Sequence, residues 1–330
     1  MKAAIVGIAG PTLLPMEAAL FRAFSPAGII LFGRNIVDPA QLLLLMADLR
    51  AVLPAPAVFM VDQEGGRVAR LRPPHWRAHP SARVLGNLFD TNPRAALRAA
   101  WLTGALIGAD CAAAGFTATA APVLDLSVPG AHDVIGDRAL AEDPAVIARL
   151  ARALAAGIGA AGVQPVGKHA PGHGRARADS HLALPRVDAN DMDADILPFA
   201  LSADLPWIMT AHIVYPTFDP MLPATLSSSV ISGVIRGRIG FKGVLVTDDL
   251  AMKALSGTPA DLAVQAIAAG CDIALYCSGD LAPTEALLRR VPPVIPATAE
   301  RLAAARAGAA RRRLSLDSAA LAAERDRLLA

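Results

Sequence analysis

Residues 164–185 read QPVGKHAPGHGRARADSHLALP. The first five residues form a short apolar run that predicts a buried strand, and the prolines and glycines after it prevent a long helix. The loop that follows holds a lysine, an aspartate and three of the chain's seven histidines: Lys168, His169, His173, Asp179 and His181. Solvated polar side chains are the alternative interpretation, but a strand that runs into such a loop is typical of a catalytic rim.

Seven further apolar runs recur along the chain, each followed by turn residues and a helical pattern: 3–8, 28–32, 58–62, 119–124, 207–211, 244–247 and 273–276. The helices expected between and after them cover 39–52, 93–114, 144–161, 191–203, 228–237, 258–269, 298–313 and 318–329, with Thr298 and Ser318 as N-caps. Strands buried on both faces that alternate with helices predict a (β/α)8 TIM barrel, a single domain over residues 1–330. An open doubly wound sheet is the alternative, but no GxGxxG follows an early strand.

The polar residues support the barrel, because catalytic groups in such folds lie where strands end. Six of the eight runs end in polar side chains or are followed by them: Arg34 and Asn35, Asp62, Asp125, Lys168 and His169, His212, and Asp248. We expect these groups to meet at one rim.

Two of these strand ends carry more than one charged residue. VDQEGGRVAR (61–70) places Asp62, Arg67 and Arg70 around a tight turn, which suits recognition of sugar hydroxyls. A structural Asp–Arg pair is the alternative, more so for Arg67. GVLVTDDLAM (243–252) ends in two carboxylates, of which only one is expected to face the site because adjacent residues of a strand point in opposite directions. We predict that this one is Asp248 and that the other caps a helix.

Composition narrows the classes of function. The 330 residues are 54% hydrophobic and 18% charged, which excludes a disordered chain. The net charge is only +2, so the composition gives no indication of a nucleic-acid-binding surface. Three cysteines without a CxxC pair suit a reducing compartment. The apolar N-terminus is predicted to be a first strand and not a signal peptide, and no apolar run is long enough to span a membrane. We expect a cytoplasmic monomer with no membrane partner.

Five motifs in order, VDQEGGRVARL, IGDR, GKHAPGHG with DSHLALP, MTAHIVYP and VTDDLAMKAL, resemble the family 3 glycoside hydrolases over about residues 5–280. Within that family the chain is similar to bacterial β-N-acetylhexosaminidases of peptidoglycan recycling. The resemblance implies hydrolysis of terminal N-acetylglucosamine from a sugar or muropeptide substrate, with no cofactor. Ala170 and Arg175 depart from the family pattern. Arg138, in IGDR, is a weak signal by itself, because a surface ion pair would serve as well.

The resemblance also implies a retaining mechanism and assigns roles. Asp248 corresponds to the nucleophile, His181 to the acid/base and Asp179 to its partner. The substrate-binding positions of the family map onto Asp62, Arg70, Arg138, Lys168 and His169. An imidazole can donate a proton near neutral pH, and a nearby carboxylate can orient it.

Two other functions compete with this one. A metal-dependent barrel hydrolase could use His169, His173 and His181, but Pro171 and Gly172 rule out the helical spacing that an HxxxH pair needs. A non-catalytic sugar-binding protein could share the fold. The Asp179, His181 and Asp248 set favours an enzyme.

Overall fold

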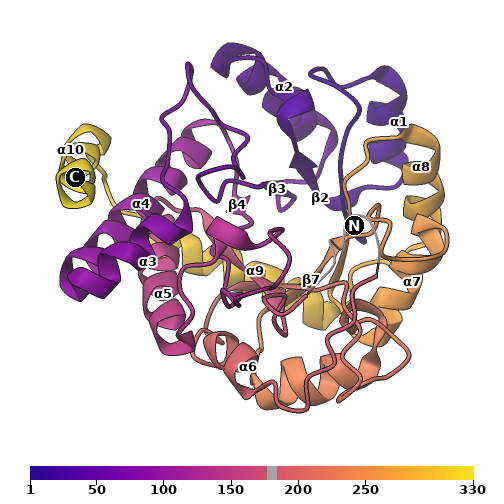
Figure 1. Ribbon diagram of the computed structural model, residues 1–330. Coiled ribbons are helices and arrows are strands. Elements are labelled where there is room, and N and C mark those ends of the chain that lie inside the picture. Colours follow the sequence, from indigo (N-terminus) through magenta and orange to yellow (C-terminus); the bar gives the residue numbers. More distant parts are fainter. Residues whose placement is uncertain (177–183) are drawn as a thin grey trace.

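The computed structural model describes residues 1–176 and 184–330, and in these ranges eight parallel strands close into a barrel (Figure 1). The strands pair in chain order, and the last one returns to the first. They are β1 Lys2–Val6, β2 Pro26–Leu31, β3 Val58–Val61, β4 Ala118–Thr119, β5 Gln164–Ala170, β6 Trp207–Thr210, β7 Val244–Asp249 and β8 Ile273–Tyr276. The predicted TIM barrel is confirmed.

Most helices of the described residues surround the strands as an outer ring (Figure 1). The helices are α1 Pro15–Ala23, α2 Pro39–Val52, α3 Ala82–Thr91, α4 Pro93–Ala113, α5 Pro144–Ala160, α6 Asp193–Ala200, a π-helix η4 Val230–Arg238, α7 Pro259–Ala269, α8 Leu281–Arg290, α9 Pro296–Arg312 and α10 Ser318–Leu329. Short 3-10 segments are η1 Gly33–Asn35, η2 Gly136–Arg138 and η3 Ala224–Leu226. Four helices begin with proline after a capping side chain that accepts a backbone N–H: Asp38, Asn92, Asp143 and Thr258.

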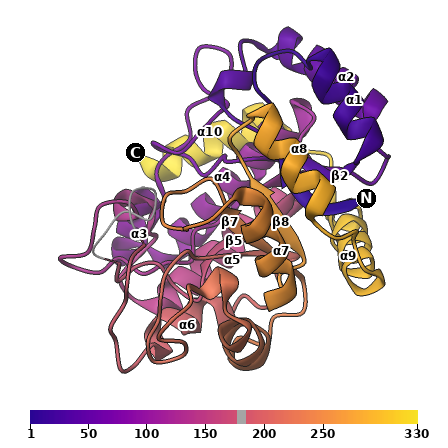
Figure 2. The same ribbon diagram turned by 90° about the vertical axis from the view of Figure 1, so that its right-hand side faces the viewer.

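Two apolar layers hold the barrel together. Inside it, buried residues such as Ile30, Met60 and Val246 form one cluster, which Leu302 and Ala305 of α9 join. Helix α9 therefore covers the end at which the strands begin, where Figure 2 also shows the N-terminus. A larger cluster fills the space between strands and helices. With that end closed, the opposite end of the barrel is left for a site.

Several local expectations are corrected. The run 119–124 yields only the two-residue β4, because Pro122 has no N–H to continue the ladder. Residues 228–237 form most of the π-helix η4. The N-cap of α9 is Ile295, and the hydroxyl of Thr298 donates to Asp272 instead. Asp317, not Ser318, caps α10. Helices α1, α3 and α8 were not predicted.

The C-terminal helix α10 lies outside the ring, beside α4 (Figure 1). Arg98 of α4 forms a bidentate pair with Glu324, both contacts at 2.7 Å. None of the helices in the described parts of the chain is long and apolar enough to cross a membrane.

Candidate active site

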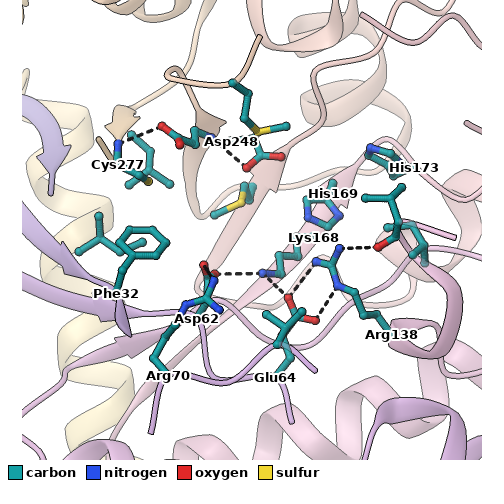
Figure 3. A pocket seen from close by; sticks show the side chains of 18 residues that line it. Phe32, Asp62, Glu64, Arg70, Arg138, Lys168, His169, His173, Asp248 and Cys277 are labelled. Atoms are coloured by element: carbon teal, nitrogen blue, oxygen red, sulfur yellow. Dashed lines mark hydrogen bonds and ion pairs between the residues drawn. The ribbon is translucent and has the colours of Figure 1, made fainter. Parts of the chain in front are cut away.

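A cavity of about 260 Å³ lies where the strands end (Figure 3). Its lining comes from strands and loops that are distant in sequence: Ile30, Phe32, Asp62, Glu64, Val68, Arg70, Val134, Ile135, Arg138, Lys168, His169, His173, Met209, Asp248, Asp249, Met252, Leu275 and Cys277. This volume is below that of pockets for drug-sized ligands, which start at about 300 Å³, so it suits a single sugar ring.

Five charged side chains of alternating sign form a network along one wall (Figure 3). Arg70 Nη2 lies 3.0 Å from Asp62 Oδ2, and Asp62 Oδ1 lies 3.2 Å from Lys168 Nζ. Lys168 Nζ is 2.6 Å from Glu64 Oε1, and Arg138 donates to both oxygens of Glu64 at 2.9 Å. Charged donors and acceptors arranged in this way match the alternating donors and acceptors of sugar hydroxyls.

This network keeps its members ionised despite burial. Burial would raise the pKa of Asp62, but Lys168 and Arg70 hold it below its ordinary value. Burial would likewise raise the pKa of Glu64, but Arg138 and Lys168 lower it well below the usual range of a glutamate. Burial alone would lower the pKa of Lys168, but Glu64 and Asp62 raise it.

Asp125, directly after the β4 region, organises two histidines. Its side chain is fully buried, and Oδ2 lies 2.7 Å from His169 Nδ1. Asp125 Oδ1 also accepts the backbone N–H of His169 at 3.1 Å and that of His173 at 2.7 Å. Since Nδ1 of His169 is directed at the carboxylate, Nε2 is the nitrogen available to a ligand. Burial, together with His169, lowers the pKa of His173 to about 4, so this ring is neutral at pH 7.

Asp248 enters the cavity from the end of β7 (Figure 3). Its Oδ1 accepts the N–H of Asp249 at 2.8 Å. Burial would raise the pKa of Asp248, but the neighbouring His169 and His212, with that N–H, lower it to about 2. A carboxylate that stays ionised next to a ring-sized cavity has the state that a nucleophile requires.

Asp249 also belongs to the residues that line the cavity, but its carboxylate is directed at two backbone N–H groups. Its Oδ1 accepts the N–H groups of Ala251 and Cys277, both at 2.9 Å. The first contact resembles the predicted cap, although a turn and not a regular helix follows. Burial raises the pKa of Asp249. Because two backbone donors occupy its carboxylate, Asp249 joins the ends of β7 and β8.

The structure brings together the predicted residues that it describes: Asp62, Arg70, Arg138, Lys168, His169 and Asp248. Asp179 and His181 lie outside the described residues. Asp62 and Arg70 form the ion pair that a structural role would require, and both residues also line the cavity, as sugar recognition would require. The two interpretations of this pair are therefore compatible. Arg138 forms an ion pair, but a buried one at the cavity wall and not one on the surface.

Three other arginines and Asn35 have structural roles. Arg67 Nε lies 2.9 Å from Asp137 Oδ1, and its Nη2 donates to the carbonyls of residues 133–135, which holds the loop before Arg138 in place. Arg34 and Asn35 donate to backbone carbonyls, at Ile8 among others, and do not line the cavity. Arg175 donates to Asp195 Oδ2 at 2.7 Å.

Glu64 and Asp125 are the site residues whose roles the sequence did not reveal. Glu64 lies in the VDQEGG turn and Asp125 at the end of an apolar run, and neither position by itself indicates a partner. Their partners are 74 and 44 positions away in the chain. Within the described ranges, no three His, Cys, Asp or Glu side chains are arranged to hold a metal ion.

Replacing Glu64 by glutamine is expected to lower kcat/KM about 10–100-fold, because the loss of one charge-assisted hydrogen bond costs about 1.5–3 kcal/mol. The neutral amide would leave Lys168 and Arg138 facing each other without the carboxylate that balances them. Glu285→Gln is the matched control, since Glu285 pairs with Arg289 on the exposed surface of α8. Steady-state kinetics of both variants check the prediction, and equal activity in the two would contradict it.

Comparisons with known proteins identify the family of the chain. A profile of the glycosyl hydrolase family 3 N-terminal domain matches residues 17–313. The chain is 40% identical over 302 residues to a beta-hexosaminidase of Bordetella avium, covering 88% of this chain and 85% of that protein. A beta-hexosaminidase of Aromatoleum aromaticum is also 40% identical, with 84% and 80% covered.

Solved structures of similar proteins superpose on nearly the whole chain. The crystal structure of NagZ from Neisseria gonorrhoeae in complex with N-trifluoroacetyl-D-glucosamine superposes with a TM-score of 0.88 at 32% identity, covering 100% of this chain and 98% of that one. The beta-N-acetylhexosaminidase of Beutenbergia cavernae superposes with a TM-score of 0.74 at 30% identity, covering 99% and 95%.

Proposed function

Since the chain belongs to glycosyl hydrolase family 3, we propose that this glycoside hydrolase is an exo-acting β-N-acetylhexosaminidase that removes terminal, non-reducing, β-linked N-acetylglucosamine. The observation that carries the proposal is the cavity itself. An ionised Asp248 borders a space for one sugar ring, and a network of charged hydrogen-bonding groups borders the same space. The names of the relatives support the choice of an N-acetylated sugar.

The ring would be held by the five substrate-binding residues of the family pattern: Asp62, Arg70, Arg138, Lys168 and His169. The carboxylate of Asp62 would accept hydrogen bonds from the hydroxyl groups of the sugar. The side chains of Arg70, Arg138 and Lys168 would donate hydrogen bonds to its oxygen atoms. The contacts of Asp62 and Lys168 to one another orient both groups before a ligand arrives. A prearranged polar site loses less free energy on binding than one that must reorganise.

Bond cleavage would follow a double displacement. Asp248 attacks the anomeric carbon while His181 donates a proton to the departing oxygen, and a glycosyl ester of Asp248 forms. His181 then accepts a proton from water, which attacks the anomeric carbon and releases the sugar with retained configuration. Asp179 would orient His181 and stabilise its cationic form. The roles of His181 and Asp179 rest on the DSH motif alone.

We further propose that the natural substrate is a muropeptide in which N-acetylglucosamine is β-1,4-linked to 1,6-anhydro-N-acetylmuramic acid, cleaved during peptidoglycan recycling. The motif resemblance supports this substrate. We also propose a cytoplasmic, monomeric enzyme. Three buried and unpaired cysteines are compatible with a reducing compartment: Cys111, Cys271 and Cys277.

Turnover of a 4-nitrophenyl N-acetyl-β-glucosaminide tests the proposal. Release of nitrophenolate with formation of the β-anomer of N-acetylglucosamine, followed by NMR, is the expected result. Binding of N-acetylglucosamine without turnover would support a sugar-binding protein instead. Initial release of the α-anomer would mean inversion and would exclude the double displacement.

The depressed pKa of Asp248 predicts how labelling of the nucleophile depends on pH. A 2-fluoro sugar with a dinitrophenolate leaving group needs no proton donor, so its rate of reaction reports on the nucleophile. Because the pKa of Asp248 is lowered to about 2, the carboxylate stays ionised as the pH falls. We expect a constant labelling rate from about pH 7 to about pH 5. A rate that halves near about pH 5, with the circular dichroism spectrum unchanged, would contradict this.

A further inference from the structure

His212, in the MTAHIVYP motif, is fully buried just after β6 and has no part in the mechanism proposed above. Its ring makes two hydrogen bonds at opposite edges. Nδ1 lies 2.7 Å from Thr225 Oγ1, and Nε2 lies 3.0 Å from the backbone carbonyl oxygen of Asp249. The imidazole therefore connects the η3 segment with the last residue of β7, which follows Asp248 directly.

The chemistry of the partners determines one of the ring protons. A carbonyl oxygen can only accept, so Nε2 of His212 must carry a hydrogen and donate it to Asp249. Thr225 Oγ1 also lies 2.8 Å from Thr210 Oγ1 and 3.0 Å from the carbonyl oxygen of Ala211. These contacts hold the hydroxyl of Thr225, which in turn holds the ring of His212.

The bond to Asp249 acts on Asp248 through the backbone of a single residue, because the N–H and the carbonyl of Asp249 lie in two successive peptide units. Asp249 donates its N–H to Asp248 Oδ1 at 2.8 Å, while its own carboxylate is held by Ala251 and Cys277. The carbonyl oxygen of Asp249 accepts two hydrogen bonds, one from the backbone N–H of Met252 at 3.0 Å and one from His212 Nε2 at 3.0 Å. His212 is the side chain that holds this carbonyl from the neighbouring strand end. With the backbone amide, the carbonyl and the carboxylate of Asp249 all bound, the amide that orients Asp248 has a defined direction.

We propose that His212 is a positioning residue for the nucleophile, acting through the backbone of Asp249 so that Asp248 presents Oδ2 to the anomeric carbon. This inference rests on the proposed function, in which Asp248 is the nucleophile. A displacement of reacting groups by about 1 Å can cost about 10²-fold in rate. Loss of the His212–Asp249 bond should therefore slow attack by Asp248 and leave sugar binding nearly unchanged.

Two isosteric substitutions separate the two edges of the ring. In His212→Gln the amide nitrogen can take the place of Nε2 and donate to Asp249. In His212→Asn the amide nitrogen takes the place of Nδ1, near Thr225, and the donor to Asp249 is lost. His75→Asn is the matched control, because His75 is exposed and outside the cavity.

The experiment measures three quantities for each variant: the rate of labelling by the 2-fluoro dinitrophenyl glycoside, the Kd of N-acetylglucosamine and the Tm. We expect His212→Asn to slow labelling about 100-fold and His212→Gln to slow it less than about 10-fold, with Kd within about twofold in both. A residue that only stabilises the fold would change Tm without this difference in labelling rate.

Labelling of His212→Asn at the parent rate would overturn the inference, and so would equal losses in His212→Asn and His212→Gln. If His212→Asn does not fold, Thr225→Val against Thr225→Ser applies the same test one bond further away, and equal labelling rates in that pair would also overturn it. Peptide mapping of the labelled parent protein keeps the two proposals apart. A label on a residue other than Asp248 would refute the proposed nucleophile, whatever the His212 variants do.

Discussion

Asp248→Ala is expected to retain the fold and to lose at least about 10⁴-fold in kcat, because removing a covalent nucleophile removes the reaction path itself. Asp248 is the penultimate residue of β7, lies beside the cavity and is ionised at neutral pH. Its side chain accepts a hydrogen bond from the N–H of Asp249, a contact that the folded chain can lose without losing its core. The far-ultraviolet circular dichroism spectrum should match that of the parent.

Two chemical tests assign the loss to the nucleophile. Azide can enter the space left by the carboxylate, and it should restore part of the turnover of Asp248→Ala and yield the α-glycosyl azide. In the parent, a 2-fluoro glycoside should leave a sugar ester on Asp248. A label on Asp249 or Glu64 would contradict the assignment. Strong inhibition by a thiazoline without any trapped ester would indicate that the substrate's own acetamide is the nucleophile.

His181→Ala is expected to reduce muropeptide cleavage about 10²–10⁴-fold, the usual contribution of general acid–base catalysis. Hydrolysis of a dinitrophenyl glycoside should lose far less in its first step, because dinitrophenolate departs without a proton. The ratio of the two losses, measured as kcat/KM for each substrate, is the diagnostic quantity. Asp179→Asn should show the same pattern with a smaller amplitude, since it removes only the charge that supports the imidazolium.

Equal losses on both substrates would mean that His181 binds or folds and does not transfer a proton. Azide supplies a control here too, because it needs no general base. It should accelerate the second step of His181→Ala and give the β-glycosyl azide. Absence of that product, with labelling of Asp248 intact, would place proton transfer on another residue. His169, held by Asp125 at the cavity wall, would then be the next residue to replace.

Much of the fold could be predicted because its signals are local. Strands buried on both faces read as apolar runs, and Pro after Asp or Asn marks a helix start, so α2 was predicted with its observed bounds. The exceptions have physical reasons as well. Pro122 shortens β4. Helices α1, α3 and α8 have only 9 or 10 residues each, so few turns are present to show a helical period.

The sequence by itself determined the order of the eight strands, most of the helices between them, the polar residues at the strand ends and, through five motifs, the family. These features depend on neighbours in the chain. Only the tertiary structure decided which charges pair: Glu64 lies between Lys168 and Arg138, Asp125 holds His169, and His212 reaches Asp249. The reason is that these partners belong to different strands and loops, whose distances are set by barrel closure and strand register, and no local pattern encodes them.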